Sequence, residues 1–170
     1  MVTLRDLNPD DALALTRVYS GASVRYTNGQ ALTLDQAHEK IGAALARAAE
    51  SPSAQWSWAI VANDEMIGLT AVRRRSPSLG TLSYILRDDT WGNGYATEAA
   101  KHAVSHAFTT AGLTRLEAMH HPGNPASGGV LIKTGFTSVG TCDRQDHDGA
   151  VVPYLVYALH HPTSTAGSAS

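Results

Sequence analysis

The segment from residue 86 to residue 98 has the pattern best suited to bind a ligand. A predicted strand runs into a loop that contains Gly92 and Gly94, and this loop opens a helix. Glycines let a backbone approach a ligand closely because no Cβ is in the way, and the first N–H groups of a helix have no partner within it. With the helix dipole, these groups form an anion site suited to a diphosphate. The same pattern also occurs as a tight connection that binds nothing.

The loop matches neither of the two common nucleotide-binding fingerprints. No Gly-Lys-Ser/Thr follows the glycines, as a Walker loop requires, and the third glycine of a dinucleotide fingerprint is missing. We therefore predict that backbone amides alone hold the phosphates, without a metal or a lysine.

A second group of motifs follows the glycine loop and has to be read together with it. Residues 115–118 read Arg-Leu-Glu-Ala, and residues 124–136 read Asn-Pro-Ala-Ser-Gly-Gly-Val-Leu-Ile-Lys-Thr-Gly-Phe. Residues 91–99 read Trp-Gly-Asn-Gly-Tyr-Ala-Thr-Glu-Ala. In type, order and spacing these segments resemble the GNAT superfamily of acetyltransferases, in its branch of ribosomal-protein N-terminal acetyltransferases.

The resemblance implies an enzyme that binds acetyl-CoA and transfers its acetyl group directly to an amine. The resemblance implies that backbone amides bind the CoA diphosphate. These amides belong to Gly92, Asn93, Gly94, Tyr95, Ala96 and Thr97. The resemblance also implies that four residues lie beside the pantetheine arm: Ile85, Leu86, Arg87 and Asn124. Amides at the end of the strand before the loop would also stabilise the oxyanion that forms during transfer.

Direct transfer needs a proton donor for the CoA thiolate. Many enzymes of this family use a tyrosine on the helix of the second motif, but Leu131 occupies that position here. The resemblance points instead to Ser127 as the donor, close enough to the cofactor to count among its binding residues. A serine near a proline is also a common helix-capping residue, so a structural role stays open.

Transfer also needs a base that removes a proton from the amine. Glu117 is the first candidate, because it lies on the strand that flanks the cleft and matches the Arg-x-Glu-Ala motif. His120 is the second, since its ordinary pKa near 6.5 suits proton removal at neutral pH. A water chain, with both residues structural, is the alternative. Gly128 and Gly129 depart from the longer polar residues of the family and weaken this helix start.

Composition limits the other possibilities. The chain has 170 residues, 43% hydrophobic and 16% charged, with a net charge of -2, which is typical of a globular protein. Its one cysteine, Cys142, fits a reducing compartment, and no apolar run approaches the roughly 20 residues of a membrane span. We therefore expect a cytoplasmic protein, monomeric or homodimeric, without nucleic-acid or membrane partners.

Periodicity and turn residues predict the elements that position these motifs. The predicted strands are residues 2–5, 56–62, 66–72, 81–87, 116–119, 136–144 and 151–159. The predicted helices are residues 8–20, 33–48, 95–108 and 127–134. This β-α-α-β-β-β-α-β-α-β-β order predicts the α/β (α+β) class: a mixed, mostly antiparallel sheet of about seven strands flanked by about four helices. We expect a single domain over residues 1–160 and a disordered tail over residues 161–170.

Two further features bear on ligands. His102 and His106 have the i, i+4 spacing of a metal-binding pair, but no third ligand lies nearby in the sequence, so we predict no metal. The hairpin with Asp143, Asp146 and Asp148 either attracts a cationic amine or is a polar turn. Sequence alone thus predicts an N-acetyltransferase for a protein N-terminus or a small amine. A catalytically silent acyl-CoA-binding module is the alternative.

Overall fold

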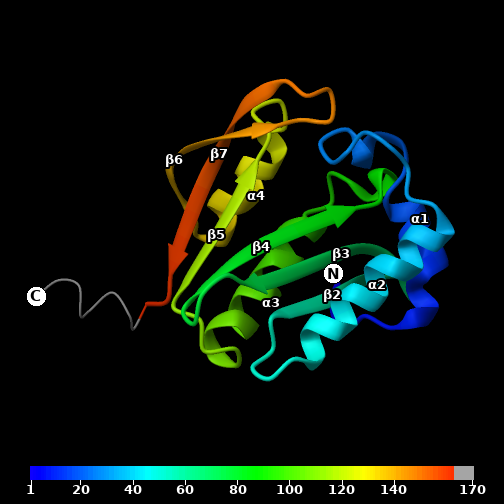
Figure 1. Cartoon of the computed structure of the whole chain (residues 1–170), viewed down its shortest axis with the longest axis horizontal. Helices are drawn as coiled ribbons and strands as arrows, with labels where there is room; N and C mark the ends of the chain where they lie inside the picture. Colours follow the sequence, from blue (N-terminus) through cyan, green and yellow to red (C-terminus); the bar gives the residue numbers. More distant parts are fainter. Residues whose placement is uncertain (163–170) are drawn as a thin grey trace, which may run out of the picture.

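The computed structural model describes residues 1–162, and these residues form one seven-stranded sheet (Figure 1). The strands are β1 (Thr3–Asp6), β2 (Gln55–Ala62), β3 (Glu65–Arg74), β4 (Leu79–Leu86), β5 (Arg115–His120), β6 (Thr137–Gln145) and β7 (Val151–His160). Their order across the sheet is β1-β2-β3-β4-β5-β7-β6, and every neighbouring pair except β4 and β5 is antiparallel. The predicted mixed, mostly antiparallel sheet is confirmed.

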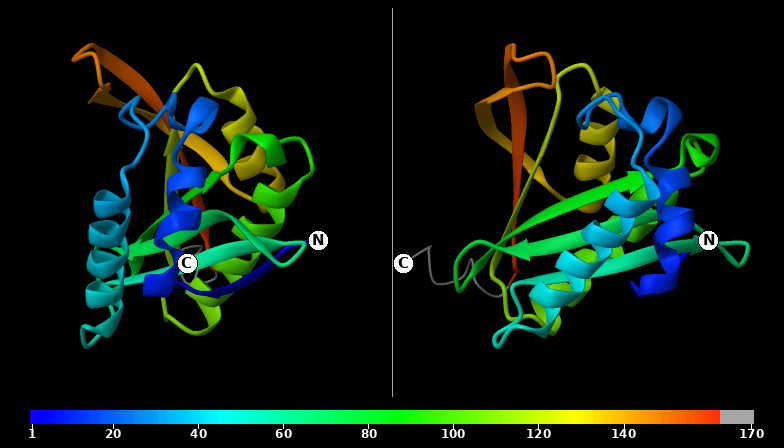
Figure 2. Two further views of the ribbon diagram at one scale, coloured as in Figure 1. Left: turned by 90° about the vertical axis from the view of Figure 1, so that its right-hand side faces the viewer. Right: turned by 45° about the vertical axis from the view of Figure 1, so that its right-hand side comes forward.

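The described residues contain four α-helices, two on each face of the sheet (Figure 2). They are α1 (Ala12–Val18), α2 (Leu34–Ala49), α3 (Tyr95–Thr109) and α4 (Pro125–Thr134). Side chains alternate between the faces of a strand, so Ala59 and Leu69 pack under α1 and α2, whereas the neighbouring Trp58 packs under α3. Two cores, one on each face, therefore hold the helices against the strands.

The β4–β5 pair positions the functional site. These parallel strands pair only from Leu79 to Thr81 on β4 and from Arg115 to Glu117 on β5. Beyond this point β4 runs on to Leu86 beside β3, while β5 follows β7 to its end. The strands therefore part into a V-shaped gap, which is visible in Figure 1 and closed at one end by the three paired residues.

Local signals in the sequence explain where the helices begin and end. The predicted capping box at the start of α2 is confirmed, since Gln36 N donates to Thr33 Oγ1 and Thr33 N donates to the Gln36 side chain. Gly135, at φ 107°, ends α4 in the left-handed conformation that favours glycine.

Other boundaries differ from the prediction. The helix predicted from residue 8 to residue 20 is a 3₁₀ turn (Pro9–Asp11) followed by α1, and two unpredicted 3₁₀ turns lie at Gly21–Val24 (η2) and Asp88–Thr90 (η3). A partly buried ion pair between Arg5 and Asp11 joins the first turn to β1 at 2.8 Å. Long-range contacts of this kind are not visible in local periodicity.

The end of the chain departs in part from the predicted tail. His161 N donates to the Thr114 carbonyl at 2.9 Å, and the His161 ring packs edge-on against Phe108. His161 is thus ordered, while residues 163–170 lie outside the described part. Among the described helices, none has the length and hydropathy needed to cross a bilayer.

Candidate active site

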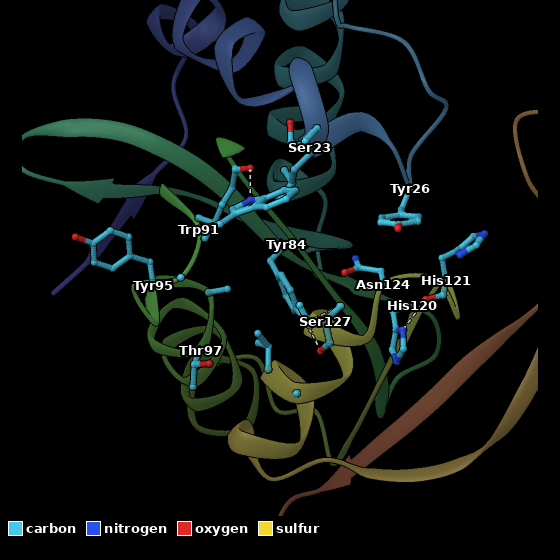
Figure 3. Close-up of a pocket in the computed structure, with 18 of the residues that line it drawn as sticks. Ser23, Tyr26, Tyr84, Trp91, Tyr95, Thr97, His120, His121, Asn124 and Ser127 are labelled. Atoms are coloured by element: carbon cyan, nitrogen blue, oxygen red, sulfur yellow. Dashed lines mark hydrogen bonds between the residues drawn. The ribbon is translucent and has the colours of Figure 1, made fainter. Parts of the chain in front are cut away.

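A cleft of about 600 Å³ opens where β4 and β5 part (Figure 3). One wall comes from the end of β4, the loop after it and the first turn of α3. The opposite wall comes from the end of β5 and from α4, and η2 with the residues after it covers the mouth. Most of the predicted site residues thus meet here from distant parts of the chain. Those lining the cleft are Ile85, Leu86, Gly92, Gly94, Tyr95, Ala96, Thr97, His120, Asn124 and Ser127.

The glycine loop has the predicted form of an anion cradle. Gly94 is the N-cap of α3 at φ 77°, and Gly92 has φ 83°, so both occupy the left-handed region where other residues are strained. No atom lies within 4 Å of a Cβ built on either glycine, so open space faces them. The backbone amides at the start of α3 border this space. The unpaired N–H groups and the dipole of a helix N-terminus favour an anion in this position.

The side chains of two residues of the predicted cofactor set, whose backbone was predicted to bind, have partners outside the cleft. The Asn93 side chain donates to the Thr90 carbonyl at 3.0 Å and does not line the cleft. Arg87 forms ion pairs with Asp89 at 2.6 Å and Glu65 at 3.1 Å, and it too lies outside the cleft wall. Conversely, Lys133 on α4 lines the cleft, although the sequence predicted amide donors alone.

The edge of β4 presents main-chain groups to the gap. Arg87 N donates to the Ile67 carbonyl on β3 at 2.7 Å. Because hydrogen-bonding direction alternates along an antiparallel strand, Ile85 also faces β3, whereas the main-chain groups of Tyr84 and Leu86 face the opened side. The Leu86 carbonyl accepts a hydrogen bond from Trp91 Nε1 at 3.2 Å. Of the predicted pantetheine segment, residues 85–87, only Leu86 therefore presents its main-chain groups to the gap.

A hydroxyl pair joins the two walls of the cleft. The Tyr84 hydroxyl on β4 lies 2.9 Å from Ser127 Oγ on α4 and donates to the Ser127 carbonyl at 3.1 Å (Figure 3). Burial raises the pKa of Tyr84 to about 12, although its hydrogen bond with Ser127 opposes the shift. The phenol is thus fully protonated at neutral pH, and its single hydrogen is engaged with Ser127.

The structure places Ser127 inside the helix rather than at its cap. Asn124 is the N-cap and Pro125 the first helical residue, so Ser127 is third, and its N–H donates to the Asn124 carbonyl at 3.2 Å. The capping alternative for Ser127 is therefore wrong. Leu131, at the family's tyrosine position, is fully buried in the core and does not line the cleft.

His120 is held by hydrogen bonds on both ring nitrogens. Nδ1 lies 2.8 Å from the His121 carbonyl, and Nε2 lies 3.3 Å from the Tyr157 hydroxyl. A carbonyl can only accept, so Nδ1 carries the proton, and Nε2 of the neutral ring is an acceptor. The rings of His120 and Tyr157 stack at 5.4 Å. The Nε2 acceptor of His120 is therefore hydrogen-bonded to Tyr157 at the end of β5.

Gly128 makes this arrangement possible. A Cβ at this position would lie 2.8 Å from His120 Nε2 and 2.9 Å from the Tyr157 hydroxyl, closer than real side chains come. Gly129, in contrast, lines the cleft with no atom within 4 Å of its Cβ position. The two adjacent glycines thus have different roles: the first admits His120, and the second leaves room in the cleft.

Glu117 lies apart from these groups. It is opposite Thr81 in the last residue pair of β4 and β5, at the closed end of the gap. Its carboxylate pairs with the Arg115 guanidinium at 2.9 Å, and it does not line the cleft. The first candidate base is thus in a surface ion pair, whereas the second, His120, lines the cleft.

An aromatic cluster at the mouth was not identified from the sequence. The rings of Tyr26 and His121 lie 5.0 Å apart, and those of His121 and Tyr154 lie 5.4 Å apart. The Tyr26 hydroxyl also donates to the Gly123 carbonyl at 2.7 Å, which ties the α1–α2 connection to the loop after β5. These three side chains line the cleft opposite the glycine loop.

His102 and His106, which have the i, i+4 spacing of a metal-binding pair, lie in different surroundings. The His106 ring packs edge-on against Trp58 at 5.0 Å, and His102 is exposed one turn earlier. Within residues 1–162, no group of three or more His, Cys, Asp or Glu side chains is placed to hold a metal ion.

Comparisons with known proteins agree with this geometry. Residues 1–137 match the family model described as an acetyltransferase (GNAT) domain. An uncharacterized N-acetyltransferase, p20 of Bacillus licheniformis, is 27% identical over 163 residues, covering 93% of this chain and 92% of its own. The structural neighbours below share the fold.

Two solved neighbours were determined with CoA species. Mycobacterium smegmatis RimJ in complex with CoA-disulfide has a TM-score of 0.83 and 23% identity, covering 95% of this chain and 83% of that one. RimL, described as a ribosomal L7/L12 alpha-N-protein acetyltransferase in complex with coenzyme A, has a TM-score of 0.79 and 15% identity, covering 94% and 93%.

Proposed function

Since the chain belongs to the GNAT acetyltransferase family and is thus an acetyl-CoA-dependent acyltransferase, we propose that it acetylates the α-amine of a protein or peptide N-terminus. The observation that carries the proposal is the pairing of two features in one cleft. An anion cradle formed by Gly92, Gly94 and the start of α3 faces the hydroxyl pair of Tyr84 and Ser127.

The cradle would hold the diphosphate of CoA through the amides of residues 94–97, and Lys133 would add a positive charge. The Leu86 main chain and the Asn124 side chain, which line the same cleft, would contact the pantetheine arm. Bound acetyl-CoA supplies the acetyl thioester, whose C–S bond breaks as the amine nitrogen bonds to the acetyl carbon. The residues around the cleft then have two tasks, donating one proton and accepting another.

Ser127 donates the proton that the departing sulfur takes up. A thiolate accepts a proton more readily from a neighbouring donor than from bulk water, because the donor is already oriented. Tyr84 orients the serine hydroxyl across the cleft and stays protonated because its pKa is about 12. Together the two hydroxyls supply what a tyrosine on α4 supplies in many relatives.

His120 takes the proton from the amine, directly or through one water. In the tautomer whose Nδ1 donates to the His121 carbonyl, Nε2 is an acceptor; its partner is the Tyr157 hydroxyl, which can relay the proton, and the His120 ring lines the cleft. Glu117 is less suited, because its carboxylate is held by Arg115 outside the cleft. The likeness to RimL supports an α-amine as the acceptor.

The test is release of the CoA thiol from acetyl-CoA, with pooled N-terminal peptides in one reaction and pooled aminoglycosides and polyamines in another. The proposal predicts release with the peptides. Release with the small amines alone would assign the second acceptor class. Binding of acetyl-CoA, seen as a raised Tm, with no release in either pool would support a silent binding module and contradict the proposal.

A further inference from the structure

A second cavity, of about 290 Å³, lies between α2 and the strands on the face opposite α3. Its walls carry four cationic side chains, Lys40, Arg47, Arg73 and Arg75, and contain no aspartate or glutamate. Gln55, Ser57, Thr81 and Ser83 add polar groups from the strands. We call this cavity the basic groove. Figure 1 shows α2 lying across this face of the sheet.

The four cations have no acidic partner within residues 1–162, where the ion pairs involve other side chains. Their contacts are with neutral groups. Arg47 donates to the Gln55 side chain at 3.2 Å, Arg75 Nε donates to Thr81 Oγ1 at 3.1 Å, and the Lys40 ammonium lies 5.3 Å from the centre of the Tyr19 ring. Most of their N–H donors therefore point into the groove or into solvent.

The positive charges of these side chains also repel one another. Partial burial lowers the pKa of Lys40, and the nearby Arg47 lowers it further. Burial likewise lowers the pKa of Arg75, with further lowering from Arg73 and Arg144. Like charges kept together without counter-charges are unfavourable, and an anion that entered the groove would relieve the repulsion. This arrangement is typical of a site whose counter-charge comes from a ligand.

Two stretches of chain carry lining residues of both the groove and the active-site cleft. On β4, Ser83 lines the groove and Ile85 lines the cleft; before α2, Tyr19 lines the groove and Ala22 lines the cleft. Two residues of a strand span about 7 Å. Arg144 lies near both cavities. Its guanidinium lies 3.2 Å from the sulfur of Met119 in the cleft wall, and its charge lowers the pKa of Arg75 in the groove.

We propose that the basic groove binds acidic residues of the acceptor peptide, while the α-amine of that peptide lies in the cleft. The inference rests on the proposed function and narrows its acceptor. An extended peptide advances about 3.3 Å per residue, so carboxylates at about the third to fifth residue would reach the groove. A polycationic amine, such as an aminoglycoside, would instead meet four unpaired positive charges.

The experiment uses three peptides that share their first two residues and carry Glu, Gln or Lys at positions three to five. Each has a fluorophore at its C-terminus, and binding to the CoA-loaded enzyme is measured by anisotropy. We expect the Glu peptide to bind about three- to tenfold more tightly than the Gln peptide, as for exposed charge pairs. The preference should weaken as salt is raised.

The double variant Arg73→Gln/Arg75→Gln should abolish the preference for Glu over Gln and raise the KM of the Glu peptide by the same factor, with kcat unchanged. Lys101→Gln on α3, on the other face of the sheet, removes one exposed charge and should change nothing. Equal binding of the three peptides to the wild-type enzyme overturns the inference.

Binding and transfer separate this inference from the proposed function. A binding preference for Glu without thiol release for any peptide would contradict the proposed function alone. Thiol release whose KM is the same for the Glu, Gln and Lys peptides would contradict the basic groove alone.

Discussion

The Tyr84 hydroxyl on β4 and the Ser127 hydroxyl on α4 lie 2.9 Å apart and join the two walls of the cleft. The strands that carry these walls share only three residue pairs before they separate. This contact therefore crosses the opened part of the sheet. It gives Ser127 a fixed neighbour and places two exchangeable protons between the two walls of the cleft.

Tyr84→Phe should lower kcat about tenfold, because Ser127 keeps its hydroxyl but loses the partner that orients it. Binding of acetyl-CoA should stay within a factor of about two, since the cradle residues are untouched. Steady-state kinetics with calorimetric binding separates the effects. A lowered kcat accompanied by a comparable loss of CoA affinity would mean that Tyr84 shapes the cofactor site instead.

Gly128→Ala should destabilise the fold by about 1–3 kcal/mol, because a Cβ would lie 2.8 Å from His120 Nε2 in a packed region. Gly129→Ala is the matched control, with no atom within 4 Å of the new carbon. It should stabilise α4 by up to about 1 kcal/mol. Urea unfolding of both variants measures the difference, and equal free energies of unfolding would show that the close approach is not real.

Gly94→Ala should weaken acetyl-CoA binding about tenfold, because a strained N-cap at φ 77° would shift the amides of the cradle. Gly112→Ala provides the control, since Gly112 has φ 72°, equally open surroundings and a position outside the cleft. Both variants should lose about 1–2 kcal/mol of stability. Only Gly94→Ala should change the Kd for acetyl-CoA. A similar change of Kd in both variants would point to general destabilisation.

The stability of the fold should fall as pH drops below 6.5. Burial lowers the pKa of His106 in the folded state, although Asp6 partly opposes the shift. Below the unfolded pKa, the unfolded chain therefore binds more protons at this position, so protonation favours unfolding. His106→Phe keeps a ring against Trp58 and should flatten the profile between pH 6.5 and pH 5 relative to wild type.

Guanidinium unfolding at several pH values measures this dependence. His102→Gln, at the exposed position one turn earlier on α3, serves as the control and should leave the slope as it is in the wild type. If the His106→Phe profile matched that of the wild type, the buried ring of His106 would not be the titrating group.

Local patterns were enough to predict the order of elements and the glycine cradle. The sheet follows from strand periodicity and turn residues, and the capping box of α2 follows from Thr33 and Gln36 alone. The cradle was predictable because positive φ and a helix start both favour particular residues at fixed positions. These features depend on neighbours within a few residues.

The remaining features depend on contacts between distant segments. Tyr84 and Ser127 are 43 residues apart, and nothing local to either indicates their contact. Glu117 is different, because residues two apart on a strand share a face. Its ion pair with Arg115 was readable from the motif itself. The cluster of Tyr26, His121 and Tyr154 needs two separate loops and strand β7, so only the fold brings it together.

The most direct test of the account compares wild type and Ser127→Ala in a single-turnover assay of thiol release, on protein whose acetyl-CoA affinity is measured in the same preparation. We predict a rate about 100-fold lower in the variant, with an unchanged Kd, and little further loss when Tyr84→Phe is added, because the two hydroxyls act as one unit. Transfer by Ser127→Ala at the wild-type rate would contradict the account.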